Sequence, residues 1–345
     1  MRLPAPRCPR DLFQAFAAYS PETGLDGLLR QFDFSGVPPR QAYYALFGRA
    51  PEKRAAAVPQ PRFAAQTKFA RGLASDEFRR TLIPQFLEAF PEKKRLLFLH
   101  IPKTAGSELS ARLMRKYPYL SSQTLQPGWG TTEAICAQVR SAVLRLAESE
   151  HVLICGHNTL QRYRDWRAVR YDDRLFAVLR DPVRATMSQV NYVLTRMFLK
   201  VANPEPDIVS WRRLFGVSEE ETGTDKGRIV ELASRILRNQ NLVPAGRACR
   251  FLGGTTAEAA IDLAICYDVD LTDVEHLDTW CSAQFGIEEK GASNISQCYV
   301  SADDLSPADL DHIGAITTED ARLYAVVRER MERLGAPSVR GVQLA

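Results

Sequence analysis

A lysine stands at the end of an apolar run in residues 96–107, LLFLHIPKTAGS, where a helix-like stretch begins. The backbone N–H groups from Thr104 to Ser107 would open that helix, whose dipole favours negative charge. Lys103 adds a full positive charge to the same loop, and the combination predicts a phosphate site. In the triphosphate motif GxxxxGK[ST] the lysine follows the glycines, whereas here it precedes Gly106, so magnesium-dependent triphosphate chemistry is disfavoured and no metal is expected.

A second group of polar side chains lies in residues 178–190, VLRDPVRATMSQV. Arg180 ends an apolar run, Pro182 is placed where a first-turn proline belongs, and Ser188 follows inside the helix. An arginine at a strand end can hold a phosphate with its planar fork, and a helical serine can donate a further hydrogen bond. Two phosphate sites on neighbouring strand ends predict a ligand with two separated phosphate groups.

These residues need a sheet to position them, and the apolar pattern predicts one. Short, almost wholly apolar runs occupy residues 96–100, 151–157, 174–180, 249–254 and 264–271. Such runs, alternating with helical stretches, are typical of a parallel sheet covered on both faces. We therefore expect an α/β fold with a P-loop-like parallel sheet flanked by helices. Its ligand would lie at the carboxyl ends of the strands.

Helices are expected on both sides of this sheet region. Apolar residues recur at helical spacing over 182–199, and a last helix is expected over 317–335. We expect residues 1–90 to form a helical N-terminal extension of uncertain role and residues 91–345 to form the ligand-binding domain. Within the extension, helical patterns occur near 9–19, 25–33 and 38–47, residues 51–66 read as a linker, and a helix capped by Ser75 or Asp76 would kink or break at Pro84.

Composition sets limits on function. The 345 residues carry a net charge of +4 and 45% hydrophobic residues, so a sizeable core is possible but the dense basic stripe of a nucleic-acid-binding protein is missing. No run approaches the roughly 18 apolar residues of a membrane span, and the N-terminus lacks the apolar part of a secretory signal, so a cytoplasmic protein is expected. The seven cysteines contain no CxxC pair, which signals neither a zinc site nor a disulfide framework.

The two phosphate motifs together resemble a known family. HIPKTAGS followed by LRDPVRATMS is similar to the paired cofactor-binding motifs of sulfotransferases that use 3′-phosphoadenosine 5′-phosphosulfate (PAPS), in the branch with heparan sulfate 2-O- and other carbohydrate sulfotransferases. The resemblance covers roughly residues 94–335, including an Asn-x-Ser segment at Asn294–Ser296 and DARLY near the end. Residues before about 90 lie outside it.

The resemblance implies roles for individual residues. Lys103, Thr104, Ala105, Gly106 and Ser107 would form the loop that binds the 5′-phosphosulfate. Of the second motif, Arg180 and Ser188 would hold the 3′-phosphate. In-line transfer of a sulfuryl group leaves negative charge on the bridging oxygen of the departing nucleotide, and a lysine at that oxygen stabilises this charge without a metal. Lys103 is therefore expected to be catalytic as well as nucleotide-binding.

An acceptor hydroxyl must also lose its proton, which calls for a base with a pKa near neutrality. HVLICGHN ends an apolar run at His157, and the related carbohydrate enzymes carry a histidine base in a similar Gly-His segment. The resemblance implies that His157 is the general base, although a histidine that only caps a strand end through hydrogen bonds is the alternative. His100 precedes the loop and is expected to support it.

Three further segments bear on the site. Glu108 would put a carboxylate near the phosphosulfate unless it faces the helix exterior. Residues 200–228 read as a polar, mobile loop that could gate the substrate, and their acidic run SEEETGTD argues against a heavily sulfated acceptor. Arg250 is expected either near the cleft or simply at the start of a strand. Asn294 and Ser296 could order a loop over the nucleotide.

The sequence as a whole predicts a bacterial, cytoplasmic sulfotransferase that transfers a sulfuryl group from PAPS to a hydroxyl of a carbohydrate, glycolipid or related acceptor. Two alternatives stay open at this point. One is a nucleotide kinase or other phosphoryl transferase of P-loop-like fold, which magnesium dependence would reveal. The other is a non-catalytic nucleotide-binding module, which would be favoured if His157 pointed away from the cleft.

Overall fold

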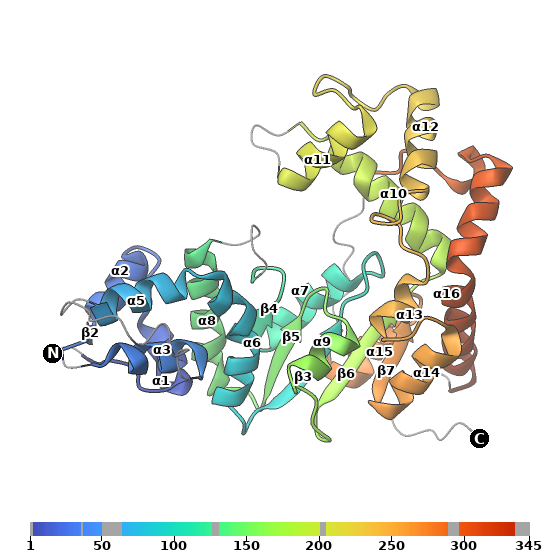
Figure 1. The fold of residues 1–345 in the computed structure, drawn as a ribbon. Helices are drawn as coiled ribbons and strands as arrows, with labels where there is room; N and C mark the ends of the chain where they lie inside the picture. Colours follow the sequence, from blue (N-terminus) through green and yellow to red (C-terminus); the bar gives the residue numbers. More distant parts are fainter. Residues whose placement is uncertain are drawn as a thin grey trace. The chain divides into compact units, whose positions relative to one another are not determined.

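The computed structural model describes residues 3–35, 37–49, 64–125, 131–200, 205–288 and 297–334 (Figure 1). Contacts divide the chain into two compact units, and each is described by itself. The first comprises Met1–Phe98, Leu113–Asn158 and Arg162–Leu175; the second comprises Leu99–Arg112, Thr159–Gln161 and Phe176–Ala345. The division at residues 90 and 91 that the sequence suggested stays a prediction.

A five-stranded parallel sheet with the order β4-β5-β3-β6-β7 confirms the α/β prediction. Its strands are β3 (Lys94–Leu99), β4 (Tyr119–Ser121), β5 (His151–Cys155), β6 (Arg174–Leu179) and β7 (Val269–Asp273). Leu97 of β3 is paired with Ile154 of β5, and Leu120 of β4 is paired with the same residue from the other side. Apart from their first residues, β3, β5 and β6 are buried throughout, which is why they read as continuous apolar runs.

Two of the five predicted strands are wrong or displaced. Residues 249–254 were expected to be a strand, but Arg247–Phe251 form helix α13, which Gly246 precedes with a φ of 57°. Cys249 is buried while Arg250 is exposed, a pattern that a short helix produces as readily as a strand. Residues 264–271 are divided, because helix α14 (Ala257–Cys266) runs into them and β7 begins only after a turn at Asp268, whose φ is 49°.

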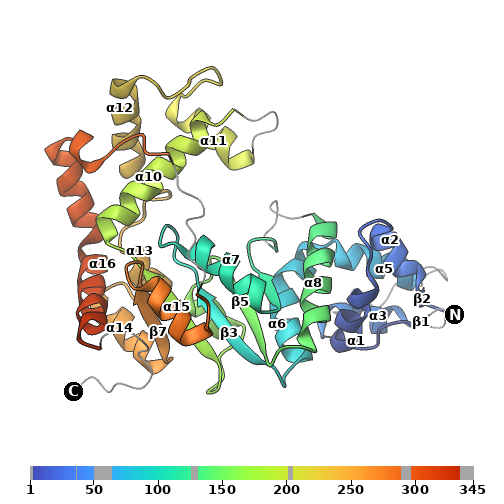
Figure 2. The same cartoon turned by 180° about the vertical axis from the view of Figure 1, so that it is seen from behind.

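The N-terminal part of the first unit is helical, as predicted. Its helices are α1 (Pro9–Ala15), α2 (Gly24–Arg30), α3 (Pro39–Phe47), α5 (Ala64–Leu73) and α6 (Asp76–Ala89). Both views show α2 and α5 gathered near α8 (Thr132–Leu146) (Figures 1 and 2). Residues 51–63 of the expected linker lie outside the described residues, and its last part, from Ala64, is already helical.

Helix α6 corrects one expectation and confirms another. Ser75 caps it, since its Oγ accepts a hydrogen bond of 3.2 Å from the N–H of Phe78. The helix continues through Pro84 rather than ending there. Burial of Phe78, Leu82 and Phe86 on one face holds the helix on both sides of the proline, which outweighs the missing hydrogen bond.

The second unit is built around one long helix. Its other helices include α10 (Pro182–Phe198), α11 (Pro206–Phe215), α12 (Lys226–Leu237) and α15 (Leu277–Phe285). Helix α16 (Pro307–Leu334) packs on α10, α12, α13, α14 and β7, and Figure 2 shows it passing beside α10 and α14. The helix expected over 182–199 is confirmed, and the last one begins earlier than expected.

Residues 200–228 are not the continuous loop that the sequence suggested. Residues 201–204 lie outside the described residues, but α11 and the first turn of α12 occupy much of the remainder. Ile208 and Phe215 of α11 are buried, so this segment contributes to the core of the unit. Within the described ranges, no helix has both the length and the hydrophobicity needed to cross a bilayer.

Candidate active site

The loop between β3 and α7 (Gly106–Lys116) has an unusual backbone. Lys103 and Ala105 both have positive φ, 70° and 58°, although neither is a glycine. Each such residue costs about 1 kcal/mol or more, and residues of this kind gather at functional sites. Alternation of left-handed and ordinary conformations turns successive N–H groups toward one side, which is the geometry that binds anions.

The described part of the chain offers no acceptor to the N–H groups of this loop. Among the described residues, no backbone or side-chain acceptor takes a hydrogen bond from the N–H of any residue from 103 to 107. The N–H groups of Glu108 and Leu109 are the first that are paired, both to the carbonyl of Ala105 at 3.1 Å. Five successive donors at the start of an 11-residue helix are therefore available to a ligand.

Two side chains fix the shape of the loop. The Thr104 hydroxyl donates a 2.9 Å hydrogen bond to the carbonyl of Ile101, so Thr104 is buried against its own loop. His100, which is only 4% exposed, packs against Gly106 so closely that a Cβ there would lie 2.0 Å from the imidazole Cδ2. The position therefore requires glycine, and the contact agrees with the supporting role expected of His100. Ser107 is exposed at the start of the helix.

The amino group of Lys103 is held without an acidic partner. Its Nζ lies 4.1 Å from the centroid of the Tyr192 ring on α10, and it makes no ion pair with any described residue. Burial, and after it the positive charges of Arg180 and Arg247, together lower the pKa of Lys103 to about 8. A cation that is desolvated beside two other cations is poised to take up an anion.

Arg180 joins the end of β6 to the same loop. Its Nη1 donates a 3.3 Å hydrogen bond to the carbonyl of Lys103. The next residue, Asp181, caps α10 by accepting a 2.8 Å hydrogen bond from the N–H of Arg184. Two of the predicted phosphate-binding residues, Lys103 and Arg180, are thus in direct contact.

Ser188 is half-buried on α10, between the first turn and the tyrosine that holds Lys103. Ala185 and Tyr192 lie three residues before it and four after it, so all three share one face of the helix. Ala185 lines the pocket described next and Tyr192 contacts Lys103, although Ser188 itself does not line that pocket. The predicted serine therefore faces the side of α10 on which the cations lie.

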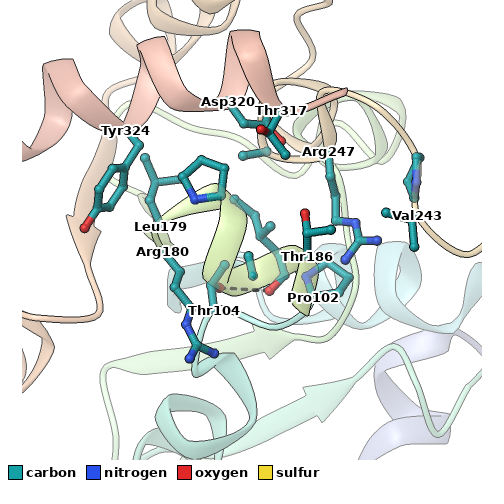
Figure 3. Close-up of a pocket in the computed structure, with 15 residues that line it drawn as sticks. Pro102, Thr104, Leu179, Arg180, Thr186, Val243, Arg247, Thr317, Asp320 and Tyr324 are labelled. Atoms are coloured by element: carbon teal, nitrogen blue, oxygen red, sulfur yellow. Dashed lines mark hydrogen bonds between the residues drawn. The ribbon is translucent and has the colours of Figure 1, made fainter. Parts of the chain in front are cut away.

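A pocket opens beside the loop, within the second unit (Figure 3). Its lining combines apolar and polar residues: Ile101, Pro102, Thr104, Leu179, Arg180, Pro182, Ala185, Thr186, Val243, Pro244, Arg247, Ala248, Thr317, Asp320 and Tyr324. Of the predicted site residues, Thr104 and Arg180 are among them. In Figure 3, Thr104 and Thr186 lie between the guanidinium groups of Arg180 and Arg247.

Sequence reasoning missed Arg247 and Thr186, and it noted Asp320 and Tyr324 only as part of the DARLY resemblance, without a role in the site. Arg247 directly follows Gly246, the residue of positive φ that precedes α13. Because residues 249–254 were interpreted as a strand, this arginine was not predicted to lie at the site. Arg250, which was expected near the cleft or at the start of a strand, is exposed on α13. Thr186 lies within LRDPVRATMS, but the resemblance gave a role in that motif only to Arg180 and Ser188. The resemblance included DARLY of α16, but it did not place that segment at the phosphate site.

His157 lies in the first unit, directly after β5. It follows Gly156, whose φ is 120°, and its side chain is exposed. The carboxamide nitrogen of Gln123 lies 3.4 Å from His157 Nδ1 and 3.3 Å from Nε2. The next residue, Asn158, is fully buried and donates a 3.1 Å hydrogen bond to the Tyr163 hydroxyl, so it is a structural residue.

The remaining expectations concern Glu108 and the Asn-x-Ser segment. Glu108 is paired with Arg112 one turn later, and Arg112 Nη1 also lies 2.6 Å from Asp278 Oδ1. Arg112 therefore offsets the carboxylate charge of Glu108 along the side of α7. This agrees with the expectation that Glu108 faces the helix exterior. Asn294 and Ser296 lie outside the described residues.

The arrangement supports one kind of chemistry most directly. Unpaired N–H groups, a desolvated lysine and two arginines can bind a ligand that carries several negative charges, and Lys103 can stabilise charge that develops on such a ligand. No known protein-family model matches the chain, and no curated protein matches it in sequence.

Proposed function

We propose that this protein is a PAPS-dependent sulfotransferase with a P-loop-like nucleotide site, acting on a hydroxyl of a carbohydrate, glycolipid or related acceptor. The observation that carries the proposal is the 103–107 loop. Its five unpaired N–H groups, its desolvated Lys103 and the arginine bonded to it lie together without an acidic partner for the lysine among the described residues. Such a site fits a phosphosulfate better than any neutral ligand.

In the proposed reaction, PAPS is the donor substrate. The acceptor oxygen attacks sulfur in line, the bond between sulfur and the bridging oxygen breaks, and the electron pair stays on that oxygen, which becomes part of 3′,5′-adenosine bisphosphate. Lys103 donates a hydrogen bond to the bridging oxygen, and its positive charge offsets the charge that develops there. The N–H groups of the loop hold the remaining phosphate oxygens in place.

The proton of the acceptor hydroxyl goes to His157 in this mechanism. His157 follows β5, which pairs in parallel with β3, so the chain leaves both strands at the same edge of the sheet. Its side chain is exposed at the surface. Gln123 contacts the ring and limits its rotation.

The class of acceptor depends on the family resemblance and on charge. The acidic run at 218–225 lies on the surface, with Glu219 and Glu220 exposed and Glu221 paired with Arg228. Exposed carboxylates repel a densely sulfated polymer, so a neutral or lightly charged saccharide or glycolipid is the better substrate.

Calorimetric titration tests the nucleotide part of the proposal. We expect 3′,5′-adenosine bisphosphate to bind more tightly than 5′-adenosine monophosphate or ATP, with no requirement for Mg²⁺. Binding that favours ATP and depends on Mg²⁺ would replace the proposal with a phosphoryl transferase. Transfer of ³⁵S from labelled PAPS to a panel of saccharides and glycolipids then identifies the acceptor.

His157→Ala tests the assignment of the base. We expect nucleotide affinity to stay within about twofold of the unmodified protein, while turnover falls about 100-fold or more because the acceptor proton has no destination. His312→Ala, which alters a helical histidine outside the site, is the matched control. Full turnover in His157→Ala would remove this residue as the base, and bisphosphate binding with no transfer to any acceptor would favour the non-catalytic alternative.

A further inference from the structure

Arg247 is the charged residue of the pocket that the sequence did not single out, and it comes from a segment far along the chain from both phosphate motifs. We propose that Arg247 is a specificity-determining residue, which makes the site prefer a nucleotide with two separated phosphate groups over one with a single 5′-phosphate. The inference rests on the proposed function and adds to it the group that selects the donor.

The backbone around Arg247 is fixed to α16. The N–H of Gly246 donates a 3.0 Å hydrogen bond to the carbonyl of Ile316, and the N–H of Cys249 donates one of the same length to Asp320 Oδ1. Arg247 Nη2 donates a 2.9 Å hydrogen bond to the carbonyl of Leu242. The first two bonds fix the backbone on either side of Arg247, and the third holds its guanidinium group. In Figure 3 the side chain extends toward Thr186 and Pro102.

The charges around Arg247 leave it available to a ligand. Burial lowers the pKa of Arg247, and the carboxylate of Asp320 opposes that shift. Asp320 makes no ion pair with Arg247 within 4.0 Å, and no other described carboxylate does. Lys103, Arg180 and Arg247 together bring three positive charges to one region, and of the residues that line the pocket only Asp320 is acidic.

The positive charge gathered here is more than a single phosphate group needs. The N–H groups of residues 103–107 and Lys103 already form a complete site for the 5′ group. Arg180 and Arg247 both line the pocket, and each guanidinium group donates one hydrogen bond to a backbone carbonyl, of Lys103 and of Leu242 respectively. The remaining N–H groups of each guanidinium can donate to phosphate oxygens. A nucleotide with only a 5′-phosphate would leave the Arg247 guanidinium desolvated and without an anion.

The test compares two nucleotides on three proteins by calorimetric titration. The unmodified protein is expected to prefer 3′,5′-adenosine bisphosphate over 5′-adenosine monophosphate. Arg247→Ala should weaken bisphosphate binding about 10- to 100-fold, as expected for charge-assisted hydrogen bonds, and monophosphate binding less than about threefold. Arg250→Ala, which removes an exposed arginine of the same helix, should change neither affinity.

Equal weakening of both nucleotides in Arg247→Ala, or an unchanged preference, would overturn the inference. If Arg247→Ala does not fold, Arg247→Gln carries the same comparison, because glutamine keeps an N–H donor for the Leu242 carbonyl. A preference that survives in these variants would leave the proposed function standing and remove only the role of Arg247. If the unmodified protein shows no preference for the bisphosphate, the proposed function fails and this inference fails with it.

Discussion

Helices α7 and α10 both begin in the second unit, each just after a strand of the parallel sheet, yet their first turns differ. At the start of α7, the N–H groups of residues 103–107 have no partner among the described residues. At the start of α10, the carboxylate of Asp181 accepts the N–H of Arg184 and the first helical residue is a proline. The first helix start is open to an anion, whereas the second is closed by the chain's own carboxylate.

This difference shows that a strand followed by a helix is not enough to make an anion site. Helix α10 contributes to the candidate site through side chains, Arg180 before it and Tyr192 within it, because its N-terminal donors and dipole are already used. Helix α7 contributes through its backbone and Lys103. The two starts are complementary, and substitutions at each should have effects of different size and kind.

The largest effect is expected from Lys103→Met, which keeps the length of the side chain and removes its charge. Turnover should fall about 100- to 1,000-fold, because the leaving oxygen loses the group that offsets its charge. Steady-state kinetics of sulfuryl transfer measure this loss. Lys116→Met at the other end of α7 is the control. A Lys103→Met protein with a turnover number near that of the unmodified protein would contradict the assignment.

Next in size is Gly106→Ala, which tests the shape of the α7 start. The new Cβ would lie 2.0 Å from the His100 ring, so the loop or the histidine must shift. We expect a loss of about 1–3 kcal/mol in the free energy of unfolding, measured with urea, together with weaker nucleotide binding. Gly314→Ala on α16, where a Cβ meets nothing within 4 Å, should be neutral or stabilising. Similar losses in both variants would argue against a special role for Gly106.

The charge of Lys103 should make nucleotide binding depend on pH. The pKa of Lys103 is about 8 in the free protein and would rise in the presence of a bound polyanion, so binding takes up a proton above that pH. Affinity should therefore fall as the pH rises from 8 to 9, by at most about tenfold per unit. Titrations in two buffers with different ionisation enthalpies measure the uptake. Lys103→Arg should abolish it, and uptake that persists in this variant would assign it to another group.

The same depressed pKa affects the stability of the free protein in the opposite sense. Between pH 8 and the ordinary lysine value of 10.5, the unfolded chain binds more protons at this position than the folded chain does. The contribution of Lys103 to stability therefore rises with pH across this window. Urea unfolding of the free protein and of Lys103→Met at pH 8 and 10 separates this contribution from those of other lysines.

The smallest effect is expected from Asp181→Ala at the start of α10. Loss of the cap should lower the free energy of unfolding by about 1 kcal/mol, measured by urea denaturation, and leave bisphosphate affinity within about threefold. Asp225→Ala, which removes the equivalent cap of α12, is the matched control for stability. If Asp181→Ala instead weakens bisphosphate binding by much more than threefold, the start of α10 serves the ligand as the start of α7 does, and the contrast between them fails.

Much of the sheet could be predicted because strands buried on both faces leave a clear pattern. The runs at 96–100, 151–157 and 174–180 are apolar throughout and correspond to β3, β5 and β6. The run at 249–254 was wrongly predicted to be a strand, because three or four apolar residues fit a short helix equally well. Strand β4 has only three residues, too few to show a period, and it exists because β5 offers it an edge.

The candidate site was predictable where chemistry is local in sequence. Lys103 and Gly106 lie within one loop and Arg180 directly follows a strand, so their types and spacing carried information. Positive φ at Lys103 and Ala105 could not be foreseen, since both residue types disfavour it and only the surrounding packing imposes it. Arg247 and Asp320 are brought to the pocket by tertiary contacts of α13 and α16, which no local pattern encodes.

The bonds from α16 to Gly246, Cys249 and Ala257 also bear on how the protein is made. The pocket draws its lining from residues as far apart as Ile101 and Tyr324, and α16 holds the segment that carries Arg247. During synthesis, the loop after β3 leaves the ribosome long before α16 does. Nascent chains should therefore be unable to retain the nucleotide until α16 has emerged, and late folding of this helix would set when the protein becomes active.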